Sequence, residues 1–100
     1  MLKKKKIPGG KLICLEVEFS GRQLSSFKLT GDFFMHPEER IQDVEEFFSV
    51  VTFPLDKIGL EELFKKNFSD LIITGFTCAD ILDLLGECYD EAKSYKMPNI

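Results

Sequence analysis

The sequence has no tryptophan, one histidine and three cysteines among its 100 residues, and each scarcity excludes something. Without tryptophan, the hydrophobic core has to come mainly from the ten phenylalanines together with leucine, isoleucine and valine. A single histidine excludes a catalytic pair of histidines. Cys14, Cys78 and Cys88 show no C-x-x-C spacing, so we expect no zinc or iron–sulfur site. An odd number of cysteines without close pairing is typical of free thiols in a reducing compartment.

Long apolar stretches are missing as well. No run reaches the roughly 18 apolar residues that a membrane-spanning helix needs. No apolar segment follows the N-terminal lysines, as it would in a signal peptide. The net charge of −4 and the pI of about 5.0 argue against nucleic acid as the main partner. We therefore expect one cytoplasmic domain over residues 1–100 that binds neither membrane nor nucleic acid.

The first third of the chain, residues 2–33, has the alternating pattern of a β-sheet. A lysine-rich segment at 3–7 leads into the turn Pro8-Gly9-Gly10, and two alternating segments follow at 11–19 and 23–33. The pattern predicts a three-stranded antiparallel meander. Its first strand should lie at an edge, where charge opposes aggregation. A phosphate-binding role for the four lysines is the less favoured alternative.

The apolar positions of the second and third segments predict their register. In both segments the main apolar set is odd-numbered, so odd positions have to face odd positions for one shared core. These residues are Ile13, Leu15, Val17 and Phe19 in the second segment and Phe27, Leu29 and Phe33 in the third. A three-residue loop at 20–22 achieves this, whereas a two-residue loop would set Leu15 against Lys28. The predicted pairs are Phe19 with Gln23, Leu15 with Phe27, Ile13 with Leu29, and Lys11 with Gly31. The other face gathers Leu12, Cys14 and Phe34 at one end, to be covered by a helix or by another protein.

The remainder has helical spacing in three segments, which completes an α+β fold. They begin at about Pro37, at about Asp56 and at Thr77. Thr77 and Asp80 form a capping-box pattern, and residues 71–74 fit either a short strand or a packed connector. The residues predicted to face inward are Ile41, Val44, Phe48 and Val51 in the first helix, Leu60, Leu63, Phe64 and Phe68 in the second, and Ile81, Leu82, Leu85, Cys88, Tyr89 and Ala92 in the third.

No complete active site emerges from these residues. Cys78 falls in the first turn of a helix, where the dipole lowers a thiol pKa, but an inert, half-buried cysteine is the commoner case. His36, next to Pro37, fits a helix start better than a general base that has no visible partner. The Gly9-Gly10 turn precedes a strand rather than a helix, so it lacks the amide-lined helix N-terminus that cradles a phosphate.

Three stretches together resemble a known family. The segments IPGGKLI at 7–13 and LTGDFFMHPEE at 29–39 are similar to the small C-terminal accessory domain of lipoate–protein ligases, and TCADIL at 77–82 is similar to the last helix of that domain. That domain is a separate polypeptide in some archaea and bacteria. The resemblance covers nearly the whole chain, and Gly75, Thr77 and Asp80 supply the pattern that introduces the family's last helix.

The resemblance implies an α+β fold of SufE/NifU-like architecture and a non-catalytic small subunit. Its partner, the catalytic subunit, holds lipoate, ATP with Mg and the catalytic lysine, and this chain alone binds no cofactor. In the resulting heterodimer the small subunit enables lipoyl-AMP formation. The lipoyl group then passes to lipoyl domains or to the glycine-cleavage H protein. The chain lacks the large catalytic domain, so we expect it to be inactive alone.

We expect the docking surface at the end of the sheet where the first turn and the third strand meet. Leu12 and Phe34 would supply apolar contact, Asp32 a polar anchor, and Lys11 would lie near the nucleotide phosphates. The predicted interface residues are Gly10, Lys11, Leu12, Gly31, Asp32 and Phe34, with no catalytic or metal-binding residue. The alternatives are an iron–sulfur or sulfur-transfer accessory protein acting through Cys78, and a stand-alone docking module with an unrelated partner.

Overall fold

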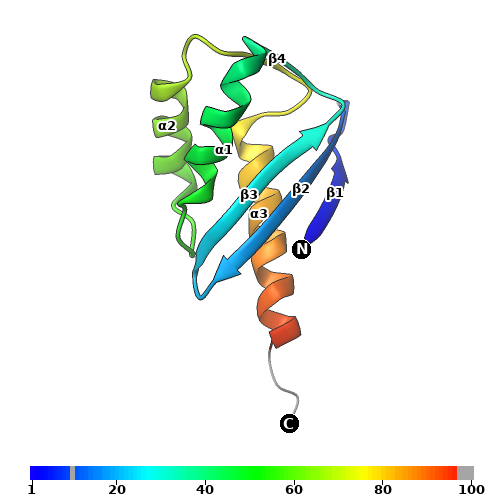
Figure 1. The fold of residues 1–100 in the computed structure, drawn as a ribbon, viewed down its shortest axis with the longest axis vertical. Helices are drawn as coiled ribbons and strands as arrows, with labels where there is room; N and C mark the ends of the chain where they lie inside the picture. Colours follow the sequence, from blue (N-terminus) through cyan, green and yellow to red (C-terminus); the bar gives the residue numbers. More distant parts are fainter. Residues whose placement is uncertain (10, 97–100) are drawn as a thin grey trace.

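The structure, a computed structural model that describes residues 1–9 and 11–96, has the predicted α+β fold (Figure 1). Three strands come first, a short strand and one 3-10 turn lead into the helices, and a second short strand lies between the last two helices. The elements are β1 (Leu2–Lys6), β2 (Leu12–Ser20), β3 (Gln23–Gly31), β4 (Phe34–His36), the 3-10 helix η1 (Glu38–Arg40), α1 (Ile41–Ser49), α2 (Lys57–Asn67), β5 (Ile72–Thr74) and α3 (Cys78–Lys96).

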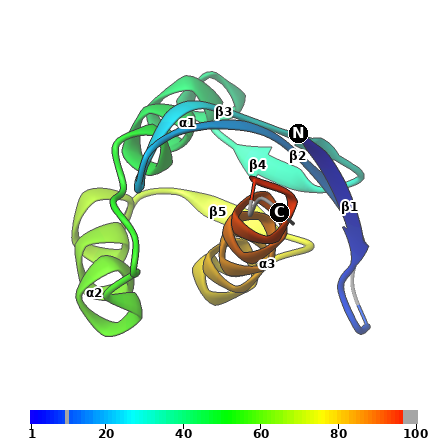
Figure 2. The same cartoon turned by 90° about the horizontal axis from the view of Figure 1, so that it is seen from below.

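The first three strands form the predicted antiparallel meander in the order β1-β2-β3, with β1 at an edge. Figure 2 shows this sheet curving over α3, with α1 beside β3 and α2 farther from the sheet. At the free edge of β3, the backbone N–H of Leu29 donates to a carboxylate oxygen of Glu45 in α1 at 2.8 Å. This hydrogen bond satisfies an edge amide that would otherwise be open to another strand.

The predicted register between β2 and β3 is wrong by two residues, although its parity is right. The loop holds only two residues, Gly21 and Arg22, with Gly21 in the left-handed region at a φ of 64°. A β-bulge then makes Ser25 an extra residue, because Phe19 pairs with Leu24 and Glu18 with Ser26. The bulge restores the pairing of odd with odd positions. The pairs after it are Val17 with Phe27, Leu15 with Leu29, and Ile13 with Gly31.

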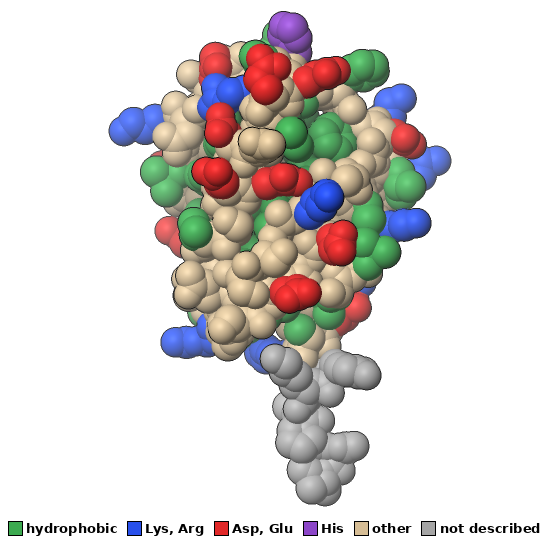
Figure 3. Space-filling view, viewed as in Figure 1, with side chains coloured by type: hydrophobic (Ala, Val, Ile, Leu, Met, Phe, Trp, Pro, Cys, Tyr) green, Lys and Arg blue, Asp and Glu red, His purple; other side chains and the backbone are tan. Residues whose placement is uncertain are grey.

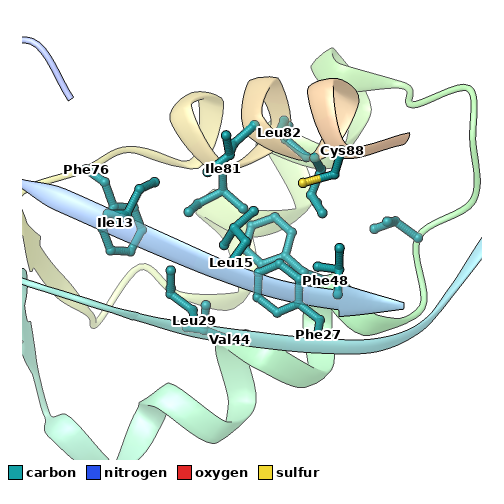
Figure 4. Close-up of a cluster of buried hydrophobic side chains, with 14 of the residues drawn as sticks. Ile13, Leu15, Phe27, Leu29, Val44, Phe48, Phe76, Ile81, Leu82 and Cys88 are labelled. Carbon is teal, nitrogen blue, oxygen red and sulfur yellow. The ribbon is translucent and has the colours of Figure 1, made fainter. Parts of the chain in front are cut away.

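The core lies between the inner face of the sheet and helices α1 and α3, as Figure 4 shows. Ile13, Leu15 and Val17 of β2 are fully buried there. The inward residues predicted for the first and third helices are all buried or half-buried. The fully buried helix residues are Val44, Phe48, Ile81, Leu82, Leu84, Leu85 and Cys88.

One inward prediction for the second helix is wrong. Leu60 and Phe64 are half-buried and Phe68 is buried, but the side chain of Leu63 remains 50% exposed. The helix buries a narrow stripe at spacing i, i+4, i+8, and Leu63 lies about 100° around the axis from Phe64. A sequence pattern does not reveal how wide a stripe the neighbouring elements will cover.

Side-chain polar contacts cap the start of α3 and join α3 to β1. At the start of α3, the N–H of Thr77 donates to Asp80 at 2.8 Å and the N–H of Asp80 donates to the Thr77 hydroxyl at 3.2 Å, which confirms the capping box. Lys3 pairs with Glu91, and Lys5 pairs with Glu87 at 2.9 Å. Two lysines of the edge strand therefore link it to α3.

Candidate functional site

The chain leaves the main sheet at Gly31 and builds a second, smaller one. The N–H of Asp32 donates to the Leu12 carbonyl at 2.9 Å, and β4 then pairs with β5. The open question about residues 71–74 is thus answered in favour of a strand. The pairs are Phe34 with Thr74, Met35 with Ile73, and His36 with Ile72. Because side chains alternate along a strand, Met35 and Ile73 point to the core, whereas the other four point outward.

The outward face of this ribbon is the floor of a groove of about 420 Å³, which we call the ribbon groove. Its two large apolar side chains are unusually open, with Phe34 73% and Ile72 64% exposed. The histidine that lines the groove marks this end of the molecule in Figure 3, with acidic side chains gathered below it. The residues lining the groove are Phe34, Met35, His36, Pro37, Glu38, Glu39, Ile72 and Thr74.

The charge at the rim of the groove is negative. Glu38 and Glu39 are exposed, and neither forms an ion pair with any side chain that the structure describes. The neighbouring cation, Arg40, does not neutralise them because it is paired with other carboxylates. Its Nε lies 2.8 Å from Oδ2 of Asp43, and its Nη1 lies 2.6 Å from Oδ2 of Asp70. The lining side chains within the described residues include no lysine or arginine.

Arg40 also connects the two sides of the groove. It follows Glu39 directly, and its partner Asp70 stands two residues before Ile72. Its guanidinium donates to the Asn67 carbonyl at 3.3 Å and lies 5.0 Å from the centre of the Phe68 ring. Because these contacts join η1 to the segment after α2, they hold the acidic rim and the apolar floor in a defined relation.

The predicted docking residues divide between two neighbouring surfaces. Leu12, Gly31 and Asp32 form a corner, where a Cβ on Gly31 would come within 2.9 Å of the Ile13 Cα. Phe34 instead lies in the ribbon groove. The prediction that Lys11 lies opposite Gly31 is wrong, because the bulge in β3 moves Ile13 into that place.

Lys11 lies beside the loop that leads into α3. Its backbone N–H donates to the Gly75 carbonyl at 3.5 Å, and its side chain packs near Gly75 and Phe33. Gly10, the remaining predicted interface residue, lies outside the described residues. Lys11 therefore stays exposed at the same end of the molecule as the corner, but with different neighbours.

The outer face of the main sheet is not covered by any helix that the structure describes. Leu12 is 39% exposed and Leu2 61% exposed on this face, while Cys14 is half-buried. Of the two alternatives left open by the sequence, cover by a helix of this chain is thus excluded for the described residues. Leu12 and Phe34 both remain open to a partner.

Cys78 and His36 show no sign of activation. Burial raises the pKa of the Cys78 thiol to about 12, which outweighs the lowering expected at a helix start. His36 is exposed at the end of β4, and η1 begins with Pro37 as its N-cap without a side-chain cap. Within the described residues, no three His, Cys, Asp or Glu side chains are grouped so that they could hold a metal ion.

Sequence reasoning missed Ile72, Thr74 and the acidic rim as parts of one site. Glu38 and Glu39 are absent from the predicted interface residues, and residues 71–74 fit either a strand or a connector from sequence alone. The signal that could have found them is the alternation of side-chain direction along residues 34–36 and 72–74. Once these two strands pair, the side chains at positions 34, 36, 72 and 74 lie on the same face. The pairing itself joins residues far apart in the chain.

A second apolar groove of about 370 Å³ lies between α1 and α2. Val50, which is 65% exposed, and Leu63 line it together with Phe47, Val51, Thr52, Pro54, Asp56 and Leu60. None of the helices described is both long and apolar enough to cross a membrane.

Comparison with models of protein families and with curated proteins finds no match. Among solved structures, the chain is similar to a chain of an archaeal lipoylation system, described as a bi-partite lipoate protein ligase and its E2 lipoyl domain from Thermoplasma acidophilum. The TM-score is 0.59 at 20% sequence identity, and the aligned part covers 83% of this chain and 92% of the other. At this identity the similarity shows a shared fold.

Proposed function

We propose that this chain is the non-catalytic small subunit of a bipartite lipoate–protein ligase. In this role it pairs with a catalytic subunit that holds lipoate, ATP and Mg, and it enables that subunit to form lipoyl-AMP. The observation that carries the proposal is the fold, shared over 83% of this chain with a chain of the archaeal lipoylation system. The resemblance of the stretches at 7–13, 29–39 and 77–82 points to the same family.

The chemistry of the surface supports an interaction role. Phe34, Ile72 and Leu12 expose apolar area at one end of the molecule, as a partner contact requires. The raised pKa of Cys78 keeps its thiol protonated near neutral pH, which weighs against sulfur transfer through this residue.

In the proposed mechanism, docking of this end completes the adenylation site of the catalytic subunit, as a lid or domain closure does in other enzymes. Exposed Lys11 would then approach the nucleotide phosphates. The product, lipoyl-AMP, serves the transfer of lipoate to lipoyl domains or to the glycine-cleavage H protein, in the cytoplasm.

The deciding experiment measures lipoyl-AMP formed by a candidate catalytic subunit from lipoate and ATP, with and without this chain. We expect adenylation to depend on its presence, and equal rates without it would refute the proposal. Asp32→Ala and Phe34→Ala should weaken complex formation, and unchanged affinity in both would remove the docking surface. Lys11→Ala should raise the KM for ATP in the assembled complex.

A further inference from the structure

We infer that the ribbon groove binds a segment of the catalytic subunit in which an apolar side chain stands next to lysine or arginine. The inference rests on the proposed function and deepens it, because it names the chemistry of the partner's contact segment. It also changes the expected grouping of residues: Phe34 acts with Ile72 and the acids of η1 rather than with Leu12.

The floor of the groove requires an apolar occupant. Phe34 and Ile72 lie diagonally across the two paired strands, within reach of one another and of a single inserted side chain. Both remain about two-thirds or more exposed, so the groove does not enclose a ligand as small-molecule pockets do, which bury roughly 70–90% of their ligand. An open, apolar floor of this kind suits a polypeptide segment.

The rim of the groove selects a cationic occupant. Glu38 and Glu39 are exposed beside the floor, and no described lysine or arginine lines the groove. The nearest cation, Arg40, is held by Asp43 and Asp70. Negative rim charges attract lysine or arginine and repel phosphate or an acidic segment, so they give specificity and salt dependence more than affinity.

The groove is held in shape before binding. Met35 and Ile73 anchor the ribbon to the core from its inner side. Arg40 joins the rim to the segment that leads into β5 through Asp70 and the Asn67 carbonyl. Because floor and rim are fixed relative to each other, an occupant does not have to order them when it binds.

The first arm of the test uses the complex. Affinity between the full chain and the catalytic subunit is measured by calorimetry at low and high salt for Phe34→Ala and for the double variant Glu38→Gln/Glu39→Gln. We expect Phe34→Ala to weaken binding roughly tenfold at either salt. The double variant should weaken it a few-fold at low salt and flatten the salt dependence.

Matched controls come from exposed residues outside the groove. Ile58→Ala removes an apolar side chain that is 76% exposed on α2, and Glu46→Gln/Glu62→Gln removes two exposed carboxylates from α1 and α2. Both controls should leave affinity unchanged. If the groove variants bind as tightly as these controls while wild type binds and supports adenylation, the inference is overturned and the proposed function stands.

The second arm is independent of the ligase. Chemical shifts of the full chain are followed by NMR during titration with acetyl-Lys-Arg-Leu-Leu-Lys-Arg-amide, with its Ser-Ser analogue and with its analogue in which glutamate replaces every basic residue. Only the first peptide should perturb residues 34–39 and 72–74. If only the first peptide perturbs these residues but the chain forms no complex with the catalytic subunit, the proposed function is refuted and the groove chemistry is supported. Equal responses to all three peptides would overturn the groove chemistry.

Discussion

Replacing Gly31 with alanine tests whether the corner between β2 and β3 is built as the structure shows. The backbone at Gly31 has a φ of +144°, which L side chains rarely adopt. A Cβ there would overlap the Leu12 carbonyl oxygen and come within 2.9 Å of the Ile13 Cα. All of these neighbours are backbone atoms of the central strand, which pairs with β1 on one side and β3 on the other.

Three contributions set the magnitude. The positive φ costs an alanine about 1–3 kcal/mol. The Cβ would also displace the backbone of β2, which is hydrogen-bonded on both sides. By analogy with overpacked cores, this displacement costs roughly a further 1–3 kcal/mol. The lower entropy of the unfolded alanine variant returns about 0.4–1 kcal/mol. The middle of these ranges is a loss of about 3 kcal/mol, which lowers the Tm by about 12–24 °C for a domain of this size.

The assay is urea denaturation followed by circular dichroism, with Gly86→Ala as the control. Gly86 lies inside α3, and a Cβ there meets nothing within 4 Å, so the same substitution should stabilise the protein by about 0.5–1 kcal/mol. A change of less than about 0.5 kcal/mol in Gly31→Ala would refute the close approach of the two strands.

Three further predictions concern the cap of α3, the ion pairs of Arg40 and the thiol of Cys78. Thr77→Ala and Asp80→Ala should each lower the free energy of unfolding by about 0.5–2 kcal/mol in urea denaturation, and a double-mutant cycle should show coupling; full additivity would contradict the reciprocal cap. Arg40→Lys keeps the charge but cannot reach both carboxylate partners, so we expect a loss of about 1 kcal/mol by the same assay, and none if the planar fork is unimportant. Because burial raises the pKa of Cys78 from 9.0 to about 12, the unfolded chain loses this proton first, and stability should fall as pH rises from 9 towards 12. Cys78→Ser should remove part of that fall in a pH series of thermal melts, and an unchanged profile would contradict the shift.

Much of the fold was predictable because its signals are local. Alternation at odd positions identified the buried face of β2, and helical spacing identified Val44 and Phe48 as core. The capping box at Thr77 was predicted residue by residue, since its partners are three positions apart. Each of these patterns depends on neighbours along the chain.

The errors arise where distant segments meet. The loop is one residue shorter than predicted, and the bulge adds one unpaired residue, Ser25. Together they shift the register by two residues, and the apolar pattern does not reveal this shift because its parity stays the same. Leu63 belongs to an apolar pattern, but no element covers its side of α2. Lys11 was assigned to Gly31 by that same register and instead lies beside Gly75.

Local patterns in the sequence were enough for the three-stranded meander, the three helices that follow it and most of their inward faces. These follow from side-chain periodicity and turn chemistry within a few residues. That Phe34 shares a groove with Ile72 and the acids of η1 depends instead on contacts between distant segments. The pairing of β4 with β5 joins segments more than 30 residues apart, and neither three-residue strand carries enough local pattern to specify its partner.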